Sequence, residues 1–298
     1  MAADRFAWVL NLDADVELAA IATGAAGART AYTPKKELVE ATRRFGPVVA
    51  ERLLDPQRDL VIDEASPPRI AEGFVGRAFC PTPRALRLLA RAGAVPEAHP
   101  ECDVLVRVNS RAFCAELGQT LEGAAFVTTL ESARAHLEST TPKGIATRWR
   151  VKRNFGMTGR GQRVVDPAKV TDADLAFVRA GLAEGGVQIE PDVTIASERS
   201  IHGMLAADGS FVLGRVVEQR CDARGAWVSS DPLPTGEEPL GLRAEAERVA
   251  RALRSARYFG PFGVDAFVYE ADGGRVLQPR SEINARYTMG FAAPPVTS

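Results

Sequence analysis

The spacing of hydrophobic and polar residues changes several times along the chain, and each change predicts a new element. The segments RFAWVLNL, residues 5–12, and RDLVIDEA, residues 58–65, contain short apolar runs that predict two strands, the first buried and followed by a loop at residues 11–15. Helices are predicted to begin at Thr33 and Thr82, because each threonine can cap a helix and is followed by a proline. This order of strand, helix, strand and helix indicates a small α/β unit with a parallel sheet.

We place this α/β unit at residues 1–105 and a second region at residues 106–298. The apolar run at residues 102–108 predicts a strand that leads through a turn into a short helix. Further on, two strand-like segments enclose a glycine-rich loop. We therefore divide the second region into a glycine-loop part, residues 106–185, and a following part, residues 186–298.

Segments with the two-residue period of strands predominate after a helix that opens with the capping box Thr171-x-x-Asp174. One more helix is predicted, over about residues 242–257, and the last two strands are joined by a turn at residues 271–274. Side chains alternate between faces along a strand, so three polar residues of the last segment point the same way. They are Glu282, Asn284 and Arg286. Such a row is unsuited to an apolar core and indicates a site.

Composition narrows the classes of function. The chain has 298 residues, of which 46% are hydrophobic and 25% charged, as is usual for a globular protein. A net charge of −1 gives no global basic field, which argues against nucleic acid and membrane partners. The four cysteines show no CxxC spacing, so we expect neither a zinc site nor a disulfide framework. The first residues do not have the pattern of a signal peptide, and we expect a cytoplasmic protein.

The first segment that carries chemistry is RWRVKRNFGMTGRGQRVV, in which three glycines stand between two strand-like runs. They are Gly156, Gly159 and Gly161. A β-turn-β flap of this kind lets backbone N–H groups approach phosphate oxygens, and Lys152 on the preceding strand adds a positive charge. The segment is neither a P-loop nor a dinucleotide fingerprint, since no Lys-Ser/Thr pair and no helix follow the last glycine. A flexible hairpin with a solvated basic face fits the segment equally well.

The second segment, GPFGVDAFVYE, places Asp265 among apolar residues of a strand, where an ionised carboxylate needs a partner. An antiparallel hairpin would bring it near Glu282 and Asn284, and such oxygen ligands suit Mg²⁺, or Mn²⁺ in its place. Same-face neighbours about 7 Å apart have room for two metal ions, or for one metal ion and a phosphate. The alternative is a buried salt bridge of either carboxylate with Arg280 or Arg286, and the pattern favours the metal.

The third segment, VQIEPDVTIASERSIHG, carries Glu190 before a proline and Glu198 eight residues later. A crossover between strands can offer backbone groups to adenine and a carboxylate to ribose hydroxyls. From this segment alone, two ordinary surface glutamates are the better interpretation.

In their order along the chain, these segments resemble the ATP-grasp superfamily. That family has a lysine before a glycine-rich flap, then an acidic crossover, and a late strand with an acidic residue followed by E-x-N-x-R. The matching pieces, within residues 106–290, are Lys152, GMTGRG, IEPDV, Asp265 and EINAR at residues 282–286. The resemblance implies a fold of α/β and α+β type. An N-terminal parallel-sheet pre-grasp domain would precede a two-lobed ATP-grasp domain with antiparallel sheets.

The resemblance also implies a role for each residue. Lys152 would contact the phosphates of ATP, and the flap from Gly156 to Gly161 would close over them. The segment from Glu190 to Val193 would hold adenine, with Glu190 or Glu198 near its amino group or the ribose. One or two Mg²⁺ ions would be bound by Asp265, Glu282 and Asn284.

Two arginines complete the implied site. Arg286 would stabilise charge on the transferring phosphoryl group or on the acyl phosphate. The family usually has a further lysine at the start of a short helix, and counting back about forty residues from Lys152 reaches Arg111 instead. We carry the phosphate-binding role to Arg111, since a guanidinium supplies the same charge with a forked geometry.

These features predict an ATP- and magnesium-dependent ligase that activates a carboxylate as an acyl phosphate and joins it to an amine, less often to a thiol or hydroxyl. Its partners would be a small-molecule or peptide carboxylate and an amine-type acceptor, and the N-terminal unit offers a surface for a homodimer. A nucleotide-binding regulatory or scaffold protein without turnover is one alternative. A phosphotransferase that stops at phosphorylation is another.

The substrate is less well defined by the sequence. The loop RCDARGAWVSSDPLPTG has the composition of a segment that faces an active site. Three arginines could pair with a substrate carboxylate: Arg220, Arg224 and Arg280. An exposed hairpin is an equal alternative for the loop, and Trp227 fits a core position as well.

Overall fold

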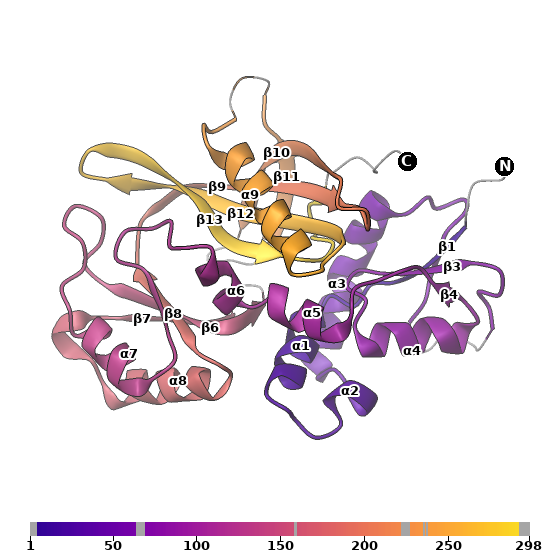
Figure 1. Ribbon diagram of the computed structural model, residues 1–298, viewed down its shortest axis with the longest axis horizontal. Coiled ribbons are helices and arrows are strands. Elements are labelled where there is room, and N and C mark those ends of the chain that lie inside the picture. The colour runs from indigo at the N-terminus through magenta and orange to yellow at the C-terminus, as the bar shows by residue number, and fades with distance from the viewer. Residues whose placement is uncertain are drawn as a thin grey trace.

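The described residues form three β-sheets (Figure 1). The computed structural model describes residues 5–63, 69–157, 160–221, 227–234, 236 and 238–291. In Figure 1 the N-terminal sheet lies at one end of the molecule and the sheet of β6–β8 at the other, with β9–β13 above and between them. No helix within these ranges is long and apolar enough to cross a membrane.

The N-terminal sheet is parallel with strand order β2-β1-β3-β4, which confirms the predicted α/β unit. Its strands are β1 (Phe6–Val9), β2 (Leu60–Val61), β3 (Val75–Ala78) and β4 (Val95–Pro96). The helices of this part are α1 (Ala14–Ala22), α2 (Ala28–Ala31), α3 (Lys36–Leu53) and α4 (Pro83–Ala92). Leu88 and Leu89 of α4 join Ala7 and Val9 of β1 in one buried cluster.

Helix ends in this part test the capping predictions. Thr82 is the N-cap of α4, whose first residue is a proline, and Gly93 ends the helix in the left-handed conformation with φ 88°. The prediction that a helix begins at Thr33 is wrong, because Lys35 keeps an extended backbone with ψ 154° and α3 starts only after it. The predicted loop at residues 11–15 is shorter than expected, since α1 begins at Ala14.

The second sheet has the order β5-β8-β6-β7 and is antiparallel throughout. It contains β5 (Ala125–Val127), β6 (Trp149–Met157), β7 (Arg160–Val165) and β8 (Val187–Pro191). It packs with α7 (Leu130–Leu137) and α8 (Asp172–Ala183), and a short 3₁₀ turn, η1 (Pro167–Lys169), precedes α8. The predicted capping box of α8 is confirmed, since Thr171 and Asp174 form it, and Thr129 caps α7.

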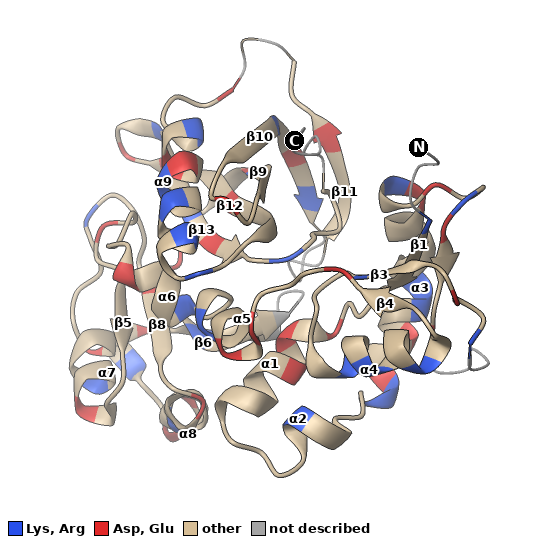
Figure 2. Cartoon of the chain, turned by 45° about the vertical axis from the view of Figure 1, so that its right-hand side comes forward, with Lys and Arg blue, Asp and Glu red and all other residues tan. Residues whose placement is uncertain are grey.

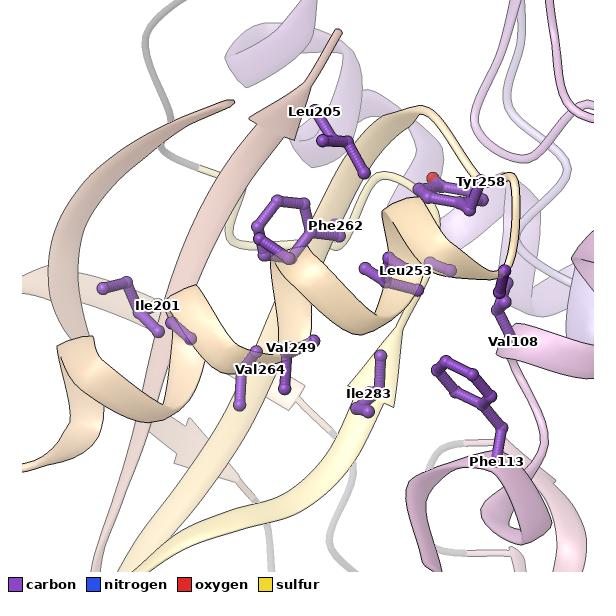
Figure 3. Packing of buried hydrophobic residues seen from close by; sticks show 14 of the residues in the cluster. Val108, Phe113, Ile201, Leu205, Val249, Leu253, Tyr258, Phe262, Val264 and Ile283 are labelled. Atoms are coloured by element: carbon purple, nitrogen blue, oxygen red, sulfur yellow. The ribbon is translucent and has the colours of Figure 1, made fainter. Parts of the chain in front are cut away.

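The third sheet is antiparallel with the order β11-β10-β9-β12-β13. It contains β9 (Ile195–Leu205), β10 (Phe211–Cys221), β11 (Trp227–Pro232), β12 (Gly260–Ala271) and β13 (Gly274–Asn284). One face packs on α9 (Leu242–Ser255), whose Val249 and Leu253 lie among the aliphatic side chains of the strands (Figure 3). Both signs of charge occur along α9 away from that contact (Figure 2). The two antiparallel sheets confirm the predicted fold class.

Two short helices connect the parts, α5 (Cys102–Val108) and α6 (Arg111–Glu116). The strand predicted for residues 102–108 is therefore wrong. The buried residues of α5 are Val104, Leu105 and Val108, a helical spacing that buries one side of the segment. They share a buried cluster with α1 and α9, so the core continues past residue 105 and the proposed division into units stays a prediction.

Candidate functional site

The five-stranded sheet has two chemically different faces. The face on α9 is apolar and includes Ile201, Phe262, Val264 and Ile283 (Figure 3). Because side chains alternate along a strand, the residues between these point to the opposite face. There the sheet lines a cleft with polar side chains: Glu198, His202, Gln219, Asp265, Glu282 and Asn284. Alternation thus separates the core from a polar site.

The cleft has a volume of about 250 Å³ and receives residues from every part of the chain. Leu12 follows β1 and Phe79 follows β3, and both line it. In the strand order β2-β1-β3-β4, this is the point at which successive connections turn in opposite directions. Open α/β sheets bind ligands at such a switch point, so the N-terminal sheet offers its usual ligand-binding edge to the cleft.

Asp265 and Glu282 lie directly opposite each other on β12 and β13. Asp265 accepts hydrogen bonds from Gln219 Nε2 at 2.8 Å and from Asn284 Nδ2 at 2.8 Å. Burial, and next the negative charge of Glu282, raise the pKa of Asp265 to about 6. The predicted proximity of Asp265, Glu282 and Asn284 is confirmed.

Arg111 is the first residue of α6, after Ser110, which caps this helix. Its Nε donates to the carbonyl oxygen of Arg153 on β6 at 3.1 Å, and its Nη2 to Glu282 Oε1 at 3.1 Å. Burial lowers the pKa of Arg111, but the charges of Glu282 and Glu190 outweigh this and raise it. The guanidinium therefore bridges the flap strand and the strand with the carboxylates.

Arg286 forms a two-point ion pair with Asp15 of α1, in which Nε lies 3.0 Å from Oδ1 and Nη2 lies 2.5 Å from Oδ2. The two side chains are only 13% and 10% exposed. Burial opposes the charge of Arg286, but Asp15 outweighs it and raises the pKa of the guanidinium. The carboxylate partner of this arginine is thus Asp15, rather than Glu282 or Asp265.

Lys152 of β6 and Glu190 of β8 form an ion pair in which the side chains are 12% and 7% exposed. Glu190 lines a cavity of about 20 Å³ beside the cleft, and Arg111 lines both spaces. Val193 packs beside Leu121 in a small apolar cluster. Lys152 and Glu190 therefore do not line the cleft itself. Arg111 connects the cleft to the neighbouring cavity that Glu190 lines.

The predicted flap is present as an antiparallel hairpin of β6 and β7. Gly156 lines the cleft, and Gly161 has φ 79°, a conformation that glycine adopts without strain. Gly159 lies outside the described residues. Glu198, on β9, lines the cleft as well, so of the two predicted glutamates only this one faces it.

The proposed substrate arginines do not gather in the cleft. Arg280 is 1% exposed and forms an ion pair with Glu245 of α9, since the register of β12 and β13 shifts between Asp265 and Phe267 and turns this residue toward the helix. Its prediction as a substrate ligand is wrong. Arg220 is 69% exposed and lies 3.7 Å from Asp231, and Arg224 lies outside the described residues.

Sequence reasoning missed several residues of the site. The sequence places Asp15 in a loop, and 271 positions separate it from Arg286, so no local pattern could have paired them. Ser200 hydrogen-bonds to Asp265, and its Oγ lies 3.0 Å from His202 Nε2. Alternation could have found this pair, because polar residues recur at every second position from Glu198 to His202. The segment RCDARGAWVSSDPLPTG also contains a strand, β11, and its Trp227 lines the cleft.

Comparison with solved structures identifies the architecture. The N5-carboxyaminoimidazole ribonucleotide synthetase of Thermus thermophilus matches with a TM-score of 0.50 and 19% identity, over 95% of this chain and 71% of that one. The synthase of Aspergillus clavatus, in complex with ADP and 5-aminoimidazole ribonucleotide, matches with a TM-score of 0.50 and 16% identity, over 96% and 71%. Biotin carboxylase of Campylobacter jejuni, in complex with an ATP ligand, matches with a TM-score of 0.53 and 14% identity, over 95% and 65%.

All three are ATP-grasp enzymes. The chain has the ATP-grasp fold. No protein-family model and no curated protein matches it in sequence. Within the ATP-grasp fold of this chain, the cleft lies between the flap hairpin, the five-stranded sheet and the carboxyl edge of the N-terminal sheet.

The donor set in the cleft fits a hard divalent cation. Two carboxylates and an amide are the oxygen ligands that Mg²⁺ accepts, and few of them are needed when phosphate oxygens complete the shell. The amide nitrogen of Asn284 donates to Asp265, so its carbonyl oxygen stays available for a ligand. Among the described residues no three His, Cys, Asp or Glu side chains form a closed metal cluster. A metal ion held by these residues would need further ligands, such as phosphate oxygens, to complete its shell.

Proposed function

We propose that the protein is an ATP-dependent ligase that activates a substrate carboxylate as an acyl phosphate and transfers the acyl group to an amine. Magnesium is the metal we assign to it. One observation carries the proposal: Asp265 and Glu282 face each other across two strands, with Asn284 beside them, in a cleft that also contains two largely buried arginines. A cluster of this charge pattern is suited to a metal-bound polyphosphate.

The residues of the cleft and around it would have three roles: metal binding, nucleotide binding and exclusion of water. Asp265, Glu282 and Asn284 would hold Mg²⁺, which when bound neutralises charge on the β- and γ-phosphate oxygens. Arg111 and Lys152 would contact phosphates, and Glu190 with the segment to Val193 would lie near adenine. Gly156 and the flap would exclude water from the reacting groups.

The proposed reaction has two steps. In the first, a carboxylate oxygen attacks the γ-phosphorus of ATP, and the bond to the bridging oxygen breaks so that ADP leaves with the electron pair. In the second, an amine attacks the acyl carbon, loses its proton, and inorganic phosphate leaves. Arg286 would stabilise the negative charge of both transition states, because it lies in the cleft and keeps its charge at any working pH.

The three cations assigned to phosphate are paired with carboxylates in this structure: Arg111 with Glu282, Lys152 with Glu190 and Arg286 with Asp15. Incoming phosphates would therefore replace carboxylates as partners. The cavity beside Glu190 has only about 20 Å³, less than an adenine ring needs, so nucleotide binding would also separate the flap sheet from the five-stranded sheet.

The similar structures support this choice of ligands. The Aspergillus clavatus synthase holds ADP with a small molecule that carries an amine, and the Campylobacter jejuni carboxylase holds an ATP ligand. For this chain the acid and the amine are left open, as is the cytoplasmic location expected from the sequence. A dimer through the N-terminal unit likewise stays a prediction.

The proposal is tested by measuring ADP and phosphate release from Mg-ATP with a panel of carboxylic acids, each with and without amines. A ligase releases phosphate only when acid and amine are both present. A stable phosphorylated product without an amine requirement would make the protein a phosphotransferase. Nucleotide binding without turnover would make it a regulatory or scaffold protein, and either result overturns the proposed ligase.

A further inference from the structure

The cleft changes from polar to apolar along β9. Ser200, which contacts Asp265, is followed on the same face of the strand by His202 and then by Met204. Met204 belongs to an apolar cluster of which three other members line the cleft. They are Leu12, Phe79 and Met289. Same-face neighbours on a strand lie about 7 Å apart, so this apolar end of the cleft begins roughly 7–14 Å from the carboxylates.

Trp227, the first residue of β11, adds a second aromatic ring to the apolar end. A Cβ atom added at Gly290 would lie only 3.5 Å from Trp227 Nε1, which places the indole against the segment that follows β13. The indole nitrogen donates to Ser230 Oγ at 2.8 Å, and the guanidinium carbon of Arg52 lies 5.8 Å from the ring centroid. These contacts fix the ring at the cleft. Together with Phe79 it offers aromatic surface to a ligand.

Arg286 joins the apolar end to the reacting groups. Its guanidinium carbon lies 5.9 Å from the centroid of the Phe79 ring. Besides the two-point contact with Asp15, its Nη1 donates to the carbonyl oxygen of Tyr287 at 3.4 Å. These contacts use three of the five N–H groups of the guanidinium, so two remain for the carboxylate of a substrate.

The apolar end has little charge to offer to the rest of a substrate. Among the described residues that line it, Asp15 and Arg286 are charged, and they are paired with each other. His202 is 1% exposed, and burial, with the nearby charge of Arg52, lowers its pKa to about 4, so its imidazole is neutral at pH 7. Thr288 is uncharged, and Arg52 is exposed and does not line the cleft. A second charged group on the substrate would therefore lose water without gaining a partner.

A second cavity of about 390 Å³, the N-terminal cavity, has no lining residue in common with the cleft. It lies at the carboxyl ends of β1 and β2 and beneath α3, where a Cβ atom added at Gly46 would meet no atom within 4 Å (Figure 1). Its walls are largely aliphatic, Asp13 in the wall is paired with Arg84, and its other charged lining residues, Arg43 and Asp63, are exposed. An apolar acid bound there would not reach the metal and phosphate site, so the cleft is the better location for a substrate.

We propose that the carboxylate substrate of the cleft is an aromatic acid without a second charge, whose carboxylate contacts Arg286 and whose ring lies at the apolar end with Phe79 and Trp227. This inference rests on the proposed function, because it names the class of acid that such a ligase would activate. Burial of the ring would supply most of the binding, and contact with the two aromatic side chains would favour it over an aliphatic body.

Binding is tested apart from turnover, by isothermal titration calorimetry of the full chain with and without Mg-ADP. The ligands are benzoate, phenylacetate and 3-phenylpropionate, and for the acid that binds best its cyclohexyl, alcohol and dicarboxylate analogues. At least one aromatic acid should bind. The cyclohexyl analogue should bind at least about threefold more weakly, because it lacks the aromatic contacts. The alcohol and the dicarboxylate should bind at least about tenfold more weakly, because one cannot pair with Arg286 and the other buries an unpaired charge.

Tryptophan fluorescence locates the bound acid. The chain has three tryptophans. Trp8 and Trp149 are each 1% exposed, whereas Trp227 lines the cleft, so acrylamide should quench mainly Trp227. An aromatic acid at the apolar end should protect this residue and reduce the quenching.

Four variants test the assigned position. Trp227→Leu should weaken binding of the aromatic acid at least about threefold, whereas Trp227→Phe, which keeps a ring, should retain most of it. Val228→Ala is the matched control on the same strand, because this side chain is 58% exposed and does not line the cleft. Gly46→Leu fills the N-terminal cavity and should also leave binding unchanged.

The inference is overturned if no aromatic acid binds, or if the cyclohexyl or dicarboxylate analogue binds as tightly. Binding that is lost in Gly46→Leu but kept in Trp227→Leu would overturn it as well, since the acid would then occupy the N-terminal cavity. The ligase itself is judged by phosphate release that needs both acid and amine. Release with aliphatic or dicarboxylic acids but not with aromatic acids would keep the ligase and overturn this inference. An aromatic acid that binds at Trp227 without any release would keep the aromatic-acid site and overturn the ligase.

Discussion

The cleft and the N-terminal cavity lie on two sides of one short segment and have opposite chemistry. Within residues 10–15, Leu12 and Asp15 face the cleft, whereas Leu10 and Asp13 face the cavity. The two aspartates also differ in their ion pairs. Asp15 forms a two-point ion pair with Arg286, and Asp13 forms a one-point ion pair with Arg84.

This difference shows two ways in which a protein prepares for a ligand. In the cleft, the arginines and carboxylates are already paired with each other. Binding therefore depends on whether phosphate is a better partner for the arginines, and metal a better partner for the carboxylates, than these existing ion pairs. In the cavity the walls are largely aliphatic, so a ligand there would gain mainly from apolar burial. The cleft should therefore be sensitive to single charges, and the cavity to volume.

The largest expected effect of a single charge is at Glu282. Glu282→Gln keeps a hydrogen-bond acceptor for Arg111 but removes one of the two carboxylates, so turnover of Mg-ATP should fall by at least about 10²- to 10³-fold. The fold should survive, because repulsion with Asp265 disappears with the charge. Steady-state ADP release and circular dichroism measure the two parts. Normal turnover, or a protein that no longer folds, would refute the metal assignment.

The ion pair of Arg286 and Asp15 should have the next largest effect. Arg286→Lys keeps the charge but cannot form the two-point contact, and we expect kcat to fall about 100-fold. Asp15→Asn should lower kcat about tenfold with little change in KM for ATP, because it only releases the guanidinium from its position. In the double variant the loss should be smaller than the product of the two, as expected for residues that act together. Independent effects would mean that Asp15 does not position Arg286.

How far the sequence predicts such pairs depends on distance along the chain. The hairpin that brings Asp265 near Glu282 was predicted from its short turn and from the alternation of side chains, although the register of the turn alone would place Asp265 opposite Arg280. The bulge that turns Arg280 toward Glu245 was not predicted. A shift in register reverses the direction of a side chain but has no signature in the amino-acid composition.

The strand prediction for residues 102–108 was wrong for another reason. Its valines favour a strand in isolation, but burial of Val104, Leu105 and Val108 against α1 and α9 decides for a helix. Lys152 and Glu190 illustrate the limit for the site: both were assigned to the nucleotide, yet only the structure shows that they are paired with each other.

A further prediction concerns the pH dependence of stability. In the folded protein Asp265 titrates with a pKa of about 6, above the ordinary value of 3.8, so the native state binds more protons than the unfolded state between these values. Stability due to this group is therefore present at low pH and is lost as pH rises to about 6. Without metal, Asp265→Asn should stabilise the protein by roughly 1–3 kcal/mol at pH 8 and by little at pH 4.5.

Urea unfolding in the presence of a chelator at the two pH values measures this difference. Mg²⁺ should reduce the advantage of Asp265→Asn at pH 8, because it stabilises only the protein with the intact carboxylate. An equal effect of the substitution at both pH values would contradict the buried, ionisable state of Asp265.

The smallest effect is expected at the cavity. Gly46→Ala should stabilise the protein by about 0.5–1 kcal/mol, because alanine is the better helix former and the added methyl group has room. Gly273→Ala, in a turn, should not give the gain that comes from helix propensity. Thermal unfolding compares the two. Destabilisation by Gly46→Ala would show that α3 packs closer to the strands than the cavity requires.

The contact of Asp15 with Arg286 also determines when the cleft can form during synthesis. The ribosome releases the N-terminal sheet first, and its helices can fold while most of the chain is still missing. The cleft needs residues separated by 271 positions, so it is completed only after Arg286 has left the exit tunnel. Until then Asp15 has no arginine to contact, and a nascent chain that stops short of this residue has its carboxylates in place but no assembled cleft.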